Sequence, residues 1–395
     1  MVSALALLPA GFTRHRHHAK TTSGWRRFAR SVLFAGLVAA IMTSMIGPLC
    51  FQANAQQLEP FVPPANSLSN SPKTDDNEKD DNAKPSRDFA EEMRKMVISL
   101  SRWAKGQRSD FSIIAMNGLD LTTFIEPGLF VTKSDAKPAR NFIRALDGFL
   151  IEAPQYGRDG YNKETAEGEV KYDQQYLERL SNTGMRFFML DYTDKMENIR
   201  KSRENLKDLD PLYYAAPPPD MQLSALAKVP STPFNENPFV IDTIHKARNF
   251  AMVVDSAPFG GKDAYVDALA NTNYDILILD AFDRGTVPLT YDDMRKLRYK
   301  KLGTPRLLLA YIDIGTAQTY RYYWRDNWRA GSPDFISSAS NKGRWGQENH
   351  VYYWEPQWQN IIFGNANSYV AGLIQLGFDG VVMDGIDDYR WWANQ

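Results

Sequence analysis

The residues best suited to chemistry lie near the C-terminal end of the chain, at residues 377–389. There a short apolar run, residues 381–383, leads directly into Asp384, and Asp387 and Asp388 follow. Consecutive apolar residues on a strand need cover on both faces, as in a parallel sheet. A carboxylate at the C-terminal tip of such a strand lies where barrel enzymes place catalytic groups, and it can exchange a proton or attack as a nucleophile. Asp384 is therefore a candidate catalytic residue.

The same arrangement recurs along the chain. Short apolar runs bounded by turn signals predict eight strands, at residues 111–117, 149–152, 187–191, 212–215, 250–255, 276–280, 307–313 and 381–384. Seven of the eight end in Asp, Glu or Asn, namely Asn117, Glu152, Asp191, Asp255, Asp280, Asp313 and Asp384. In a parallel arrangement these side chains would gather at one edge of the sheet.

Helical patterns separate the strands and would position their tips. Residues 88–104 carry apolar side chains at helical spacing, Thr290 and Asp293 form a capping-box variant, and residues 368–376 lead into the last strand. Eight alternating units favour an α/β fold, a closed (β/α)8 TIM barrel in a single domain. An open doubly wound sheet is the alternative, but no glycine-rich phosphate signature supports it.

The N-terminal region has a different composition from the rest. Residues 1–55 hold six basic residues and no acidic one, then a mostly apolar run and a small-residue site ending at Ala55, so we predict a signal peptide cleaved after Ala55. The apolar run, residues 32–46, is too short to favour the alternative, an uncleaved membrane anchor. Residues 56–87 read as a disordered linker, and residues 88–395 as the barrel.

Cleavage would change the chemistry available. It removes the only cysteine and leaves His245 and His350 as isolated histidines, which excludes disulfides and thiolate chemistry and makes a histidine metal site or triad unexpected. It also leaves 40 basic against 47 acidic residues, a net charge of −7, which disfavours nucleic-acid binding. The run from Asp384 to Asp388 offers too few ligands for a divalent cation, so we expect no metal and no cofactor.

The chain resembles a family of glycoside hydrolases, the endo-α-1,4-polygalactosaminidases and related bacterial barrel proteins once labelled cysteinyl-tRNA synthetase-like. Two segments carry most of the likeness: the Gly-Phe-Asp-Gly-x-x-x-Asp run at residues 377–384 and the Tyr-Arg-Tyr-Tyr-Trp block at residues 320–324. Weaker matches lie at residues 115–118, 146–152, 188–192, 247–250, 272–280, 310–315 and 353–359. Together they cover nearly all of residues 88–395.

Two departures from the family pattern stand out. In the family, the segment like residues 377–389 comes mid-chain and is followed by one like residues 88–117, so this chain resembles a circular permutation opened inside the fourth β/α unit. The second departure is at Thr316 and Gln318, where relatives usually have two glutamates.

The resemblance implies a pair of catalytic carboxyls. It places an Asp at the fourth family strand tip and a Glu at the sixth, which match Asp384 and Glu152. Glycosidic bond cleavage needs two such groups, a proton donor and a nucleophile or base. We expect the two tips to face each other across the barrel mouth, with burial raising the pKa of one. We assign Glu152 as the acid and Asp384 as nucleophile or base. Asp387 and Asp388 are expected to cap the final helix or bind water.

Other strand-tip residues are candidates for substrate binding. Carboxylates could hold sugar hydroxyls or an ammonium group, tyrosines and Asn117 could add hydrogen bonds, and an indole could stack on a sugar. The candidates are Asn117, Asp191, Tyr192, Asp255, Asp280, Tyr311, Asp313, Tyr320, Arg321 and Trp324. The alternatives are that the carboxylates cap helices or form ion pairs, Arg321 included. Most tryptophans of residues 324–358 are expected to form a small core under the long loop that carries them.

The resemblance implies an endo-acting hydrolase of an α-1,4-linked, galactosamine-containing polysaccharide. The predicted signal peptide indicates a secreted or periplasmic location. We expect a monomer that binds no nucleic acid and has no stable membrane span after cleavage. Two alternatives remain open. One is a non-catalytic carbohydrate-binding barrel, favoured by the loss of the two glutamates, and the other is a hydrolase of a different cell-envelope polymer.

Overall fold

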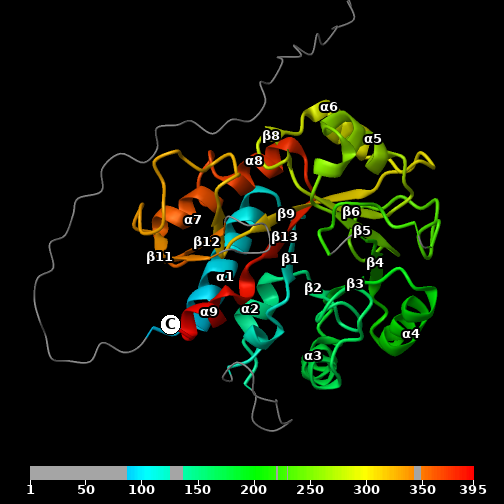
Figure 1. The fold of residues 1–395 in the computed structure, drawn as a ribbon, viewed down its shortest axis with the longest axis horizontal. Helices are drawn as coiled ribbons and strands as arrows, with labels where there is room; N and C mark the ends of the chain where they lie inside the picture. Colours follow the sequence, from blue (N-terminus) through cyan, green and yellow to red (C-terminus); the bar gives the residue numbers. More distant parts are fainter. Residues whose placement is uncertain (1–86, 125–136, 219–220, 229, 342–347) are drawn as a thin grey trace, which may run out of the picture. The chain divides into compact units, whose positions relative to one another are not determined.

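The computed structural model describes residues 87–124, 137–218, 221–228, 230–341 and 348–395, all of which belong to one compact unit (Figure 1). The predicted signal peptide and all but the last residue of the predicted linker lie outside these ranges. Among the helices of the described residues, none is both long and apolar enough to cross a membrane.

Eight parallel strands form the central sheet. Their bounds are β1 (Ser112–Met116), β2 (Gly148–Glu152), β3 (Arg186–Tyr192), β4 (Leu212–Ala216), β5 (Phe250–Val253), β6 (Ile276–Leu279), β9 (Leu307–Asp313) and β13 (Gly380–Asp384). Almost every residue in them is buried, as expected for strands covered on both faces. All eight predicted strands are confirmed, with ends that differ by a few residues.

The sheet is nearly closed into a barrel. Its hydrogen-bonded order is β4-β3-β2-β1-β13-β9-β6-β5. Strands that follow each other along the chain are therefore neighbours, and the last strand, β13, pairs with the first, β1. The outer strands β4 and β5 meet through Tyr214 and Phe250, whose ring centroids are 5.7 Å apart. This arrangement is consistent with a TIM-like barrel, in which the carboxyl ends of all strands open on one face.

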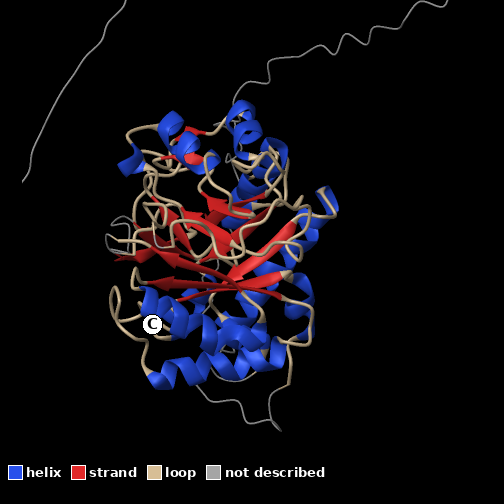
Figure 2. Ribbon diagram, turned by 90° about the vertical axis from the view of Figure 1, so that its right-hand side faces the viewer, coloured by secondary structure: helices blue, strands red, loops and turns tan. Residues whose placement is uncertain are grey.

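Helices cover the outside of the sheet (Figure 2). The α-helices are α1 (Phe89–Gln107), α2 (Arg140–Ala145), α3 (Glu167–Leu180), α4 (Met196–Leu206), α5 (Lys262–Ala270), α6 (Tyr291–Leu297), α7 (Pro356–Ile362), α8 (Tyr369–Leu376) and α9 (Tyr389–Ala393). Short 3-10 turns are η1 (Leu119–Thr122), η2 (Lys207–Leu209), η3 (Ala257–Phe259) and η4 (Ile386–Asp388). Asp88 caps α1, and the predicted capping box of Thr290 and Asp293 begins α6.

A long insertion between β9 and β13 carries its own sheet. Its three antiparallel strands, β10 (Thr316–Gln318), β11 (Ile336–Asn341) and β12 (Glu348–Val351), are ordered β10-β12-β11. A two-stranded hairpin, β7 (Phe282–Asp283) with β8 (Val287–Pro288), lies after β6. Trp358 is fully buried and donates its indole N–H to the Ile314 carbonyl at 2.8 Å. Trp328 packs edge-on against Trp324 with centroids 5.5 Å apart. These contacts confirm the expected tryptophan core; Trp345 lies outside the described residues.

Candidate active site

Two cavities open among the carboxyl-terminal ends of the strands. The larger has a volume of about 540 Å³ and is lined from the ends of β1, β2 and β3, from α3 and from the segment after β13. The smaller has a volume of about 260 Å³ and lies at the ends of β5, β6 and β9. Eight of the predicted site residues line one or the other: Asn117, Glu152 and Tyr192 the larger, and Asp255, Asp280, Tyr311, Tyr320 and Arg321 the smaller.

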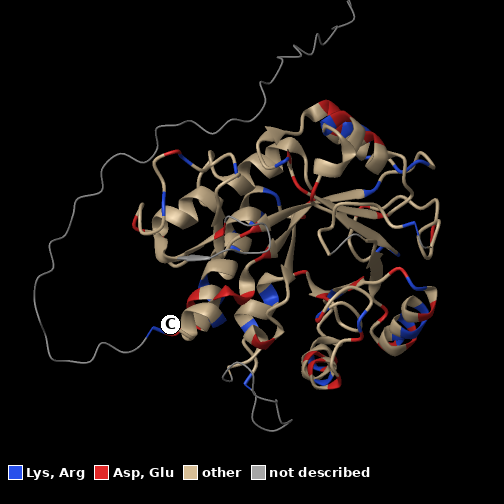
Figure 3. Cartoon of the chain, in the orientation of Figure 1, with Lys and Arg blue, Asp and Glu red and all other residues tan. Residues whose placement is uncertain are grey.

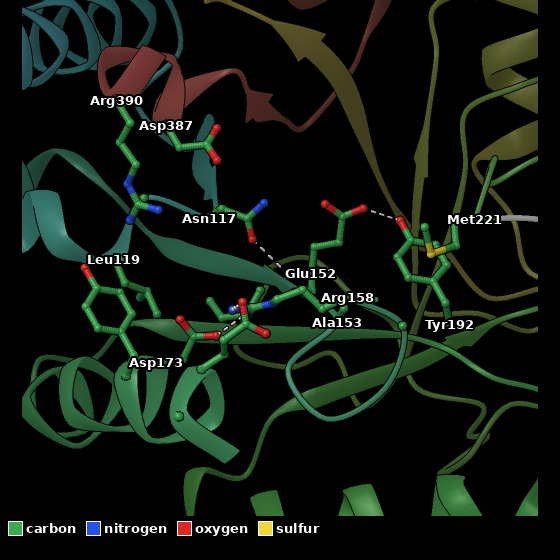
Figure 4. A pocket seen from close by; sticks show the side chains of 16 residues that line it. Asn117, Leu119, Glu152, Ala153, Arg158, Asp173, Tyr192, Met221, Asp387 and Arg390 are labelled. Atoms are coloured by element: carbon green, nitrogen blue, oxygen red, sulfur yellow. Dashed lines mark hydrogen bonds and ion pairs between the residues drawn. The ribbon is translucent and has the colours of Figure 1, made fainter. Parts of the chain in front are cut away.

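Glu152 is held in the larger cavity by its strand neighbours (Figure 4). It is the last residue of β2, and its carboxylate accepts a hydrogen bond from the hydroxyl of Tyr192, the last residue of β3. Its backbone N–H donates to Oδ1 of Asn117 at 3.0 Å, and Asn117 is the residue that follows β1. The three tip residues therefore form one hydrogen-bonded unit.

The lining of the larger cavity is acidic overall. Four carboxylates, Glu152, Glu169, Asp173 and Asp387, face two arginines, Arg158 and Arg390. Arg158 forms an ion pair with Asp173 at 2.6 Å, and Arg390 forms one with the buried Asp120 at 2.8 Å. On the outer helices, by contrast, acidic and basic residues are intermixed, for example on α4 (Figure 3). The cavity therefore favours a ligand that is neutral or positively charged.

A buried ion pair supports the smaller cavity. Arg321 donates to Asp280 at 2.5 Å, and both side chains are almost fully buried. Burial raises the pKa of Asp280, while the Arg321 guanidinium opposes that rise. Arg321 is thus both a cavity residue and the internal ion-pair partner that the sequence left as an alternative. Asp255 is half-buried and accepts a hydrogen bond from the Ala257 N–H at 2.9 Å.

Asp384 is not among the lining residues of either cavity, but it contacts residues near both. It ends β13, and its carboxylate accepts hydrogen bonds from the Tyr311 hydroxyl at 2.5 Å and from the Gly385 N–H at 2.7 Å. Tyr311 also lines the smaller cavity, whereas Asp387, three residues after Asp384, lines the larger one. Asp384 is therefore linked to both cavities through its neighbours.

The strand registers place Asp384 and Glu152 at one height in the barrel. Ala115 pairs with Met383, so the next residue, Met116, is in register with Asp384. Met116 also pairs with Leu150, so Glu152 lies two residues beyond the β2 residue that is in register with Asp384. The strands of an eight-stranded barrel are tilted relative to its axis. Residues at the same height on neighbouring strands are therefore offset by about one residue from the hydrogen-bonded register. Because β13 and β2 are two strands apart, their two-residue offset places Asp384 and Glu152 at the same height. Side chains at one height on alternate strands form a single layer inside such a barrel.

The arrangement around the ring differs from the expected one. Only β1 separates β13 from β2, so Asp384 and Glu152 are next-but-one neighbours and do not face each other across the mouth. The expectation was wrong because family strand numbers four and six are two steps apart in a ring of eight. Strand β6 lies two strands from β13 in the opposite direction around the barrel. The same register count places Asp280, at the end of β6, at the height of Asp384.

Two further carboxyls lie against Asp384. Burial, then the charge of Asp384, raises the pKa of Asp313 to about 8. The same two causes raise the pKa of Asp387 to about 7. Asp313 lies beside Asp384 in the register and accepts the N–H groups of Gly315 and Thr316, each at 2.9 Å. Burial and the negative charge of Asp384 therefore both favour the protonated forms of Asp313 and Asp387.

Thr316 and Gln318 occupy the positions where relatives usually have glutamates, and both bind Asp313. The Thr316 hydroxyl donates to its Oδ2 at 2.6 Å, and the Gln318 side-chain N–H donates to the same oxygen at 3.4 Å. The Gln318 carbonyl also accepts from Arg321 Nε at 2.6 Å. In this chain the two positions supply donors to a carboxyl.

Asp191 and Trp324 are placed away from the two cavities. Asp191 is fully buried and accepts hydrogen bonds from Ser202, Tyr213 and two backbone N–H groups, so its oxygens hold the loop after β2. Trp324 is half-buried in the insertion core described above. Both positions are structural in this fold, and neither lines the two cavities.

The sequence did not single out several cavity residues. Asp387 was expected to cap a helix or bind water, and Arg158, Asp173 and Arg390 were not considered. The only available signal was the position of Asp387 three residues beyond a strand tip.

Among the described residues, no group of three or more His, Cys, Asp and Glu side chains is arranged to hold a metal ion.

Comparison with known proteins gives relatives without a described function. The chain is 34% identical to an uncharacterized protein of Methanocaldococcus jannaschii over 132 residues, 33% of this chain and 36% of that protein. It is 30% identical over 130 residues to an uncharacterized protein of Deinococcus radiodurans, 33% of this chain and 39% of that one. A third, from Thermotoga maritima, is 33% identical over 87 residues, 22% of this chain and 25% of that one. The chain thus spans between a quarter and two fifths of the length of these relatives. No family model matches it.

Proposed function

We propose that this protein is a glycoside hydrolase that cleaves an α-1,4-linked, galactosamine-containing polysaccharide, with Asp384 and Glu152 as the catalytic pair. One observation carries the proposal: two carboxylates end alternate strands at one height of the barrel mouth, each oriented by a tyrosine hydroxyl. Two groups of this kind are what hydrolysis of a glycosidic bond requires. The substrate class rests on the resemblance of the sequence to the polygalactosaminidases.

The charge of the larger cavity supports an amino sugar as substrate. Its lining holds four carboxyl groups, of which Asp173 is paired with Arg158, and a second arginine, Arg390, which is paired with Asp120 outside the lining. A protonated amine entering this cavity would gain favourable charge interactions that a neutral sugar lacks. The smaller cavity would hold a neighbouring residue of the polymer, because it adjoins Asp384 through Tyr311.

The proposal includes an exported protein with permuted chain order. Residues 1–55 would act as a signal peptide cleaved after Ala55, residues 56–87 as a linker, and residues 88–395 as a monomeric barrel. Read in the order of the family, the strands would run from β5 through β13 and continue from β1 to β4. Mass spectrometry of the exported protein would test the cleavage site.

Release of reducing ends from partially deacetylated α-1,4-galactosaminan tests the activity. We expect the unaltered protein to release them, and Glu152→Gln and Asp384→Asn to lose turnover by at least about 10²-fold while still binding the polymer. Asp263→Asn, an exposed carboxylate on α5, is the matched control and should retain full activity. Unchanged turnover in Glu152→Gln would reject this pair, and an inactive unaltered protein would reject the hydrolase.

A carbohydrate-binding barrel without activity is the second candidate. The observation that favours it is the presence of Thr316 and Gln318 where relatives usually have glutamates. Binding of the polymer by the unaltered protein without any release of reducing ends would support this candidate. The hydrolase proposal requires both binding and release.

A further inference from the structure

Asp387 is a third carboxyl group in the larger cavity. It belongs to η4, the 3-10 turn that follows β13, and Gly385 begins that turn with a left-handed φ of 73°. The turn directs Asp387 back over the strand ends, so that it lines the same cavity as Glu152. In Figure 4 its side chain lies beside Arg390 and above Asn117, with the carboxyl group directed away from Arg390.

Hydrogen bonding distinguishes Asp387 from the two carboxylates of the pair. Glu152 accepts a hydrogen bond from Tyr192, and Asp384 accepts from Tyr311 and from the Gly385 N–H. Donors of this kind stabilise the ionised form of a carboxyl group. Within the described part of the chain, the donor to the Asp387 carboxyl is its own backbone N–H, and no side-chain hydroxyl holds it as Tyr192 and Tyr311 hold the pair.

The charges that surround Asp387 also favour its protonated form. Burial is the largest cause of its raised pKa of about 7, followed by the negative charge of Asp384, with Asp388 adding to the rise and Arg390 opposing it. Across the cavity it faces Glu152 from β2, the paired Arg158, and Glu169 and Asp173 from α3. A proton donor is most effective when its pKa lies near the working pH.

We propose that Asp387, rather than Glu152, donates the proton to the departing sugar oxygen. This role rests on the proposed hydrolase function. The proton of the Asp387 carboxyl group passes to the glycosidic oxygen as the bond from that oxygen to the anomeric carbon breaks. Water supplies the hydroxyl that bonds to the anomeric carbon, and its remaining proton passes to the Asp387 carboxylate, which restores the starting state. In this scheme neither Glu152 nor Asp384 donates the proton, and each keeps its hydrogen bond to a tyrosine hydroxyl.

The dependence of the rate on the leaving group tests the donor. An oligosaccharide with an unactivated alcohol as leaving group needs protonation, whereas a dinitrophenyl glycoside of the same oligosaccharide does not. We expect Asp387→Asn to lower kcat on the unactivated substrate by about 10²–10⁴-fold and on the dinitrophenyl substrate by less than about tenfold. Glu152→Gln should impair both substrates equally. Asp263→Asn, an exposed carboxylate on α5 outside both cavities, is the control and should keep the leaving-group dependence of the unaltered protein.

The opposite pattern would overturn the assignment. If Glu152→Gln is rescued by the activated leaving group and Asp387→Asn is not, Glu152 is the donor and Asp387 is not. If the unaltered protein cleaves neither substrate, the hydrolase proposal and the donor role fail together. If it cleaves both and Asp387→Asn has normal kinetics, only the donor role fails. Circular dichroism of each variant would establish that it is folded.

A titration gives a readout that needs no turnover. With ¹³C-labelled aspartate carboxyls, the resonance missing from Asp387→Asn identifies Asp387 in the unaltered protein. We expect it to titrate with a midpoint near neutrality and the alkaline limb of kcat/KM to share that midpoint. A midpoint below about pH 5 would overturn the donor role whatever the kinetics, because the group would be ionised at neutral pH.

Discussion

At the scale of single residues, Asp313 links the pH of the solution to the stability of the fold. Its pKa is about 8 in the folded protein, against an ordinary value of 3.8. Below pH 3.8 the carboxyl is protonated whether the chain is folded or unfolded. Between the two values the unfolded chain releases the proton and the folded chain retains it, so stability falls as pH rises, and the loss is complete above about pH 8.

Asp313→Asn should remove this part of the pH dependence. Asparagine can accept from the Gly315 and Thr316 N–H groups and donate to the Thr316 hydroxyl, and it loses only the long contact from the Gln318 amide. Urea unfolding between about pH 5 and about pH 9 should show a smaller fall in unfolding free energy for the variant. Asp255→Asn, also at a strand tip, is the control and should follow the unaltered protein. Parallel curves for Asp313→Asn and the unaltered protein would contradict the raised pKa.

The sequence could predict some site residues but not their roles. Glu152 and Asp384 were predictable because a buried apolar run ends directly in each carboxylate. Asp191 follows the same pattern, yet its side chain turns to Ser202 and Tyr213 instead of a cavity. That difference depends on a loop packing over the strand end. The raised pKa of Asp387 depends on Asp384 and on enclosure by other elements, neither of which is visible in the short-range pattern.

At the scale of elements, the turns after β9 and β13 pack directly against each other. A Cβ atom added to Gly315 would lie 2.4 Å from the Gly385 carbonyl oxygen and 2.7 Å from the Asp388 Cβ. Gly315→Ala should therefore push the two turns apart, destabilise the fold by about 1–3 kcal/mol and displace Asp384. Gly106→Ala in α1 is the control, since nothing lies within 4 Å of its added Cβ. That change should be neutral or stabilising by up to about 1 kcal/mol.

Unfolding curves and turnover together would test this contact. A stable Gly315→Ala variant with full turnover would show that the two turns can separate without consequence. We expect both quantities to fall, because the Asp313 carboxylate also lies against Gly385 and would move with the turn.

The elements themselves were largely predictable from the sequence. Continuous apolar runs bounded by turn residues gave every strand of the barrel, since strands covered on both faces need no alternation. The capping pattern at Thr290 gave the start of α6. The turn η4 was not predicted, because its direction depends on the left-handed Gly385 and on packing against Gly315.

At the scale of the whole molecule, the weakest line of the barrel is the seam between β4 and β5. The sequence suggested eight units but could not show where the ring closes, because closure depends on contacts between residues distant along the chain. Seven neighbouring strand pairs have continuous registers. Among the described residues, β4 and β5 have no such register and meet through Tyr214 and Phe250, with Phe188 also packing on Phe250 at 5.3 Å.

Phe250→Ala should open this seam selectively. Phe250 is fully buried, so truncating it should cost about 3–5 kcal/mol of unfolding free energy. Phe149→Ala on β2 is the matched control, because Phe149 is equally buried but lies where registers continue on both sides. Hydrogen exchange should quicken first in β4 and β5 for Phe250→Ala, with β13 still protected, whereas Phe149→Ala should show no preference for the seam. If both variants lose protection uniformly, the barrel opens as one unit, and the seam has no special role in holding Asp384 and Glu152 at a common height.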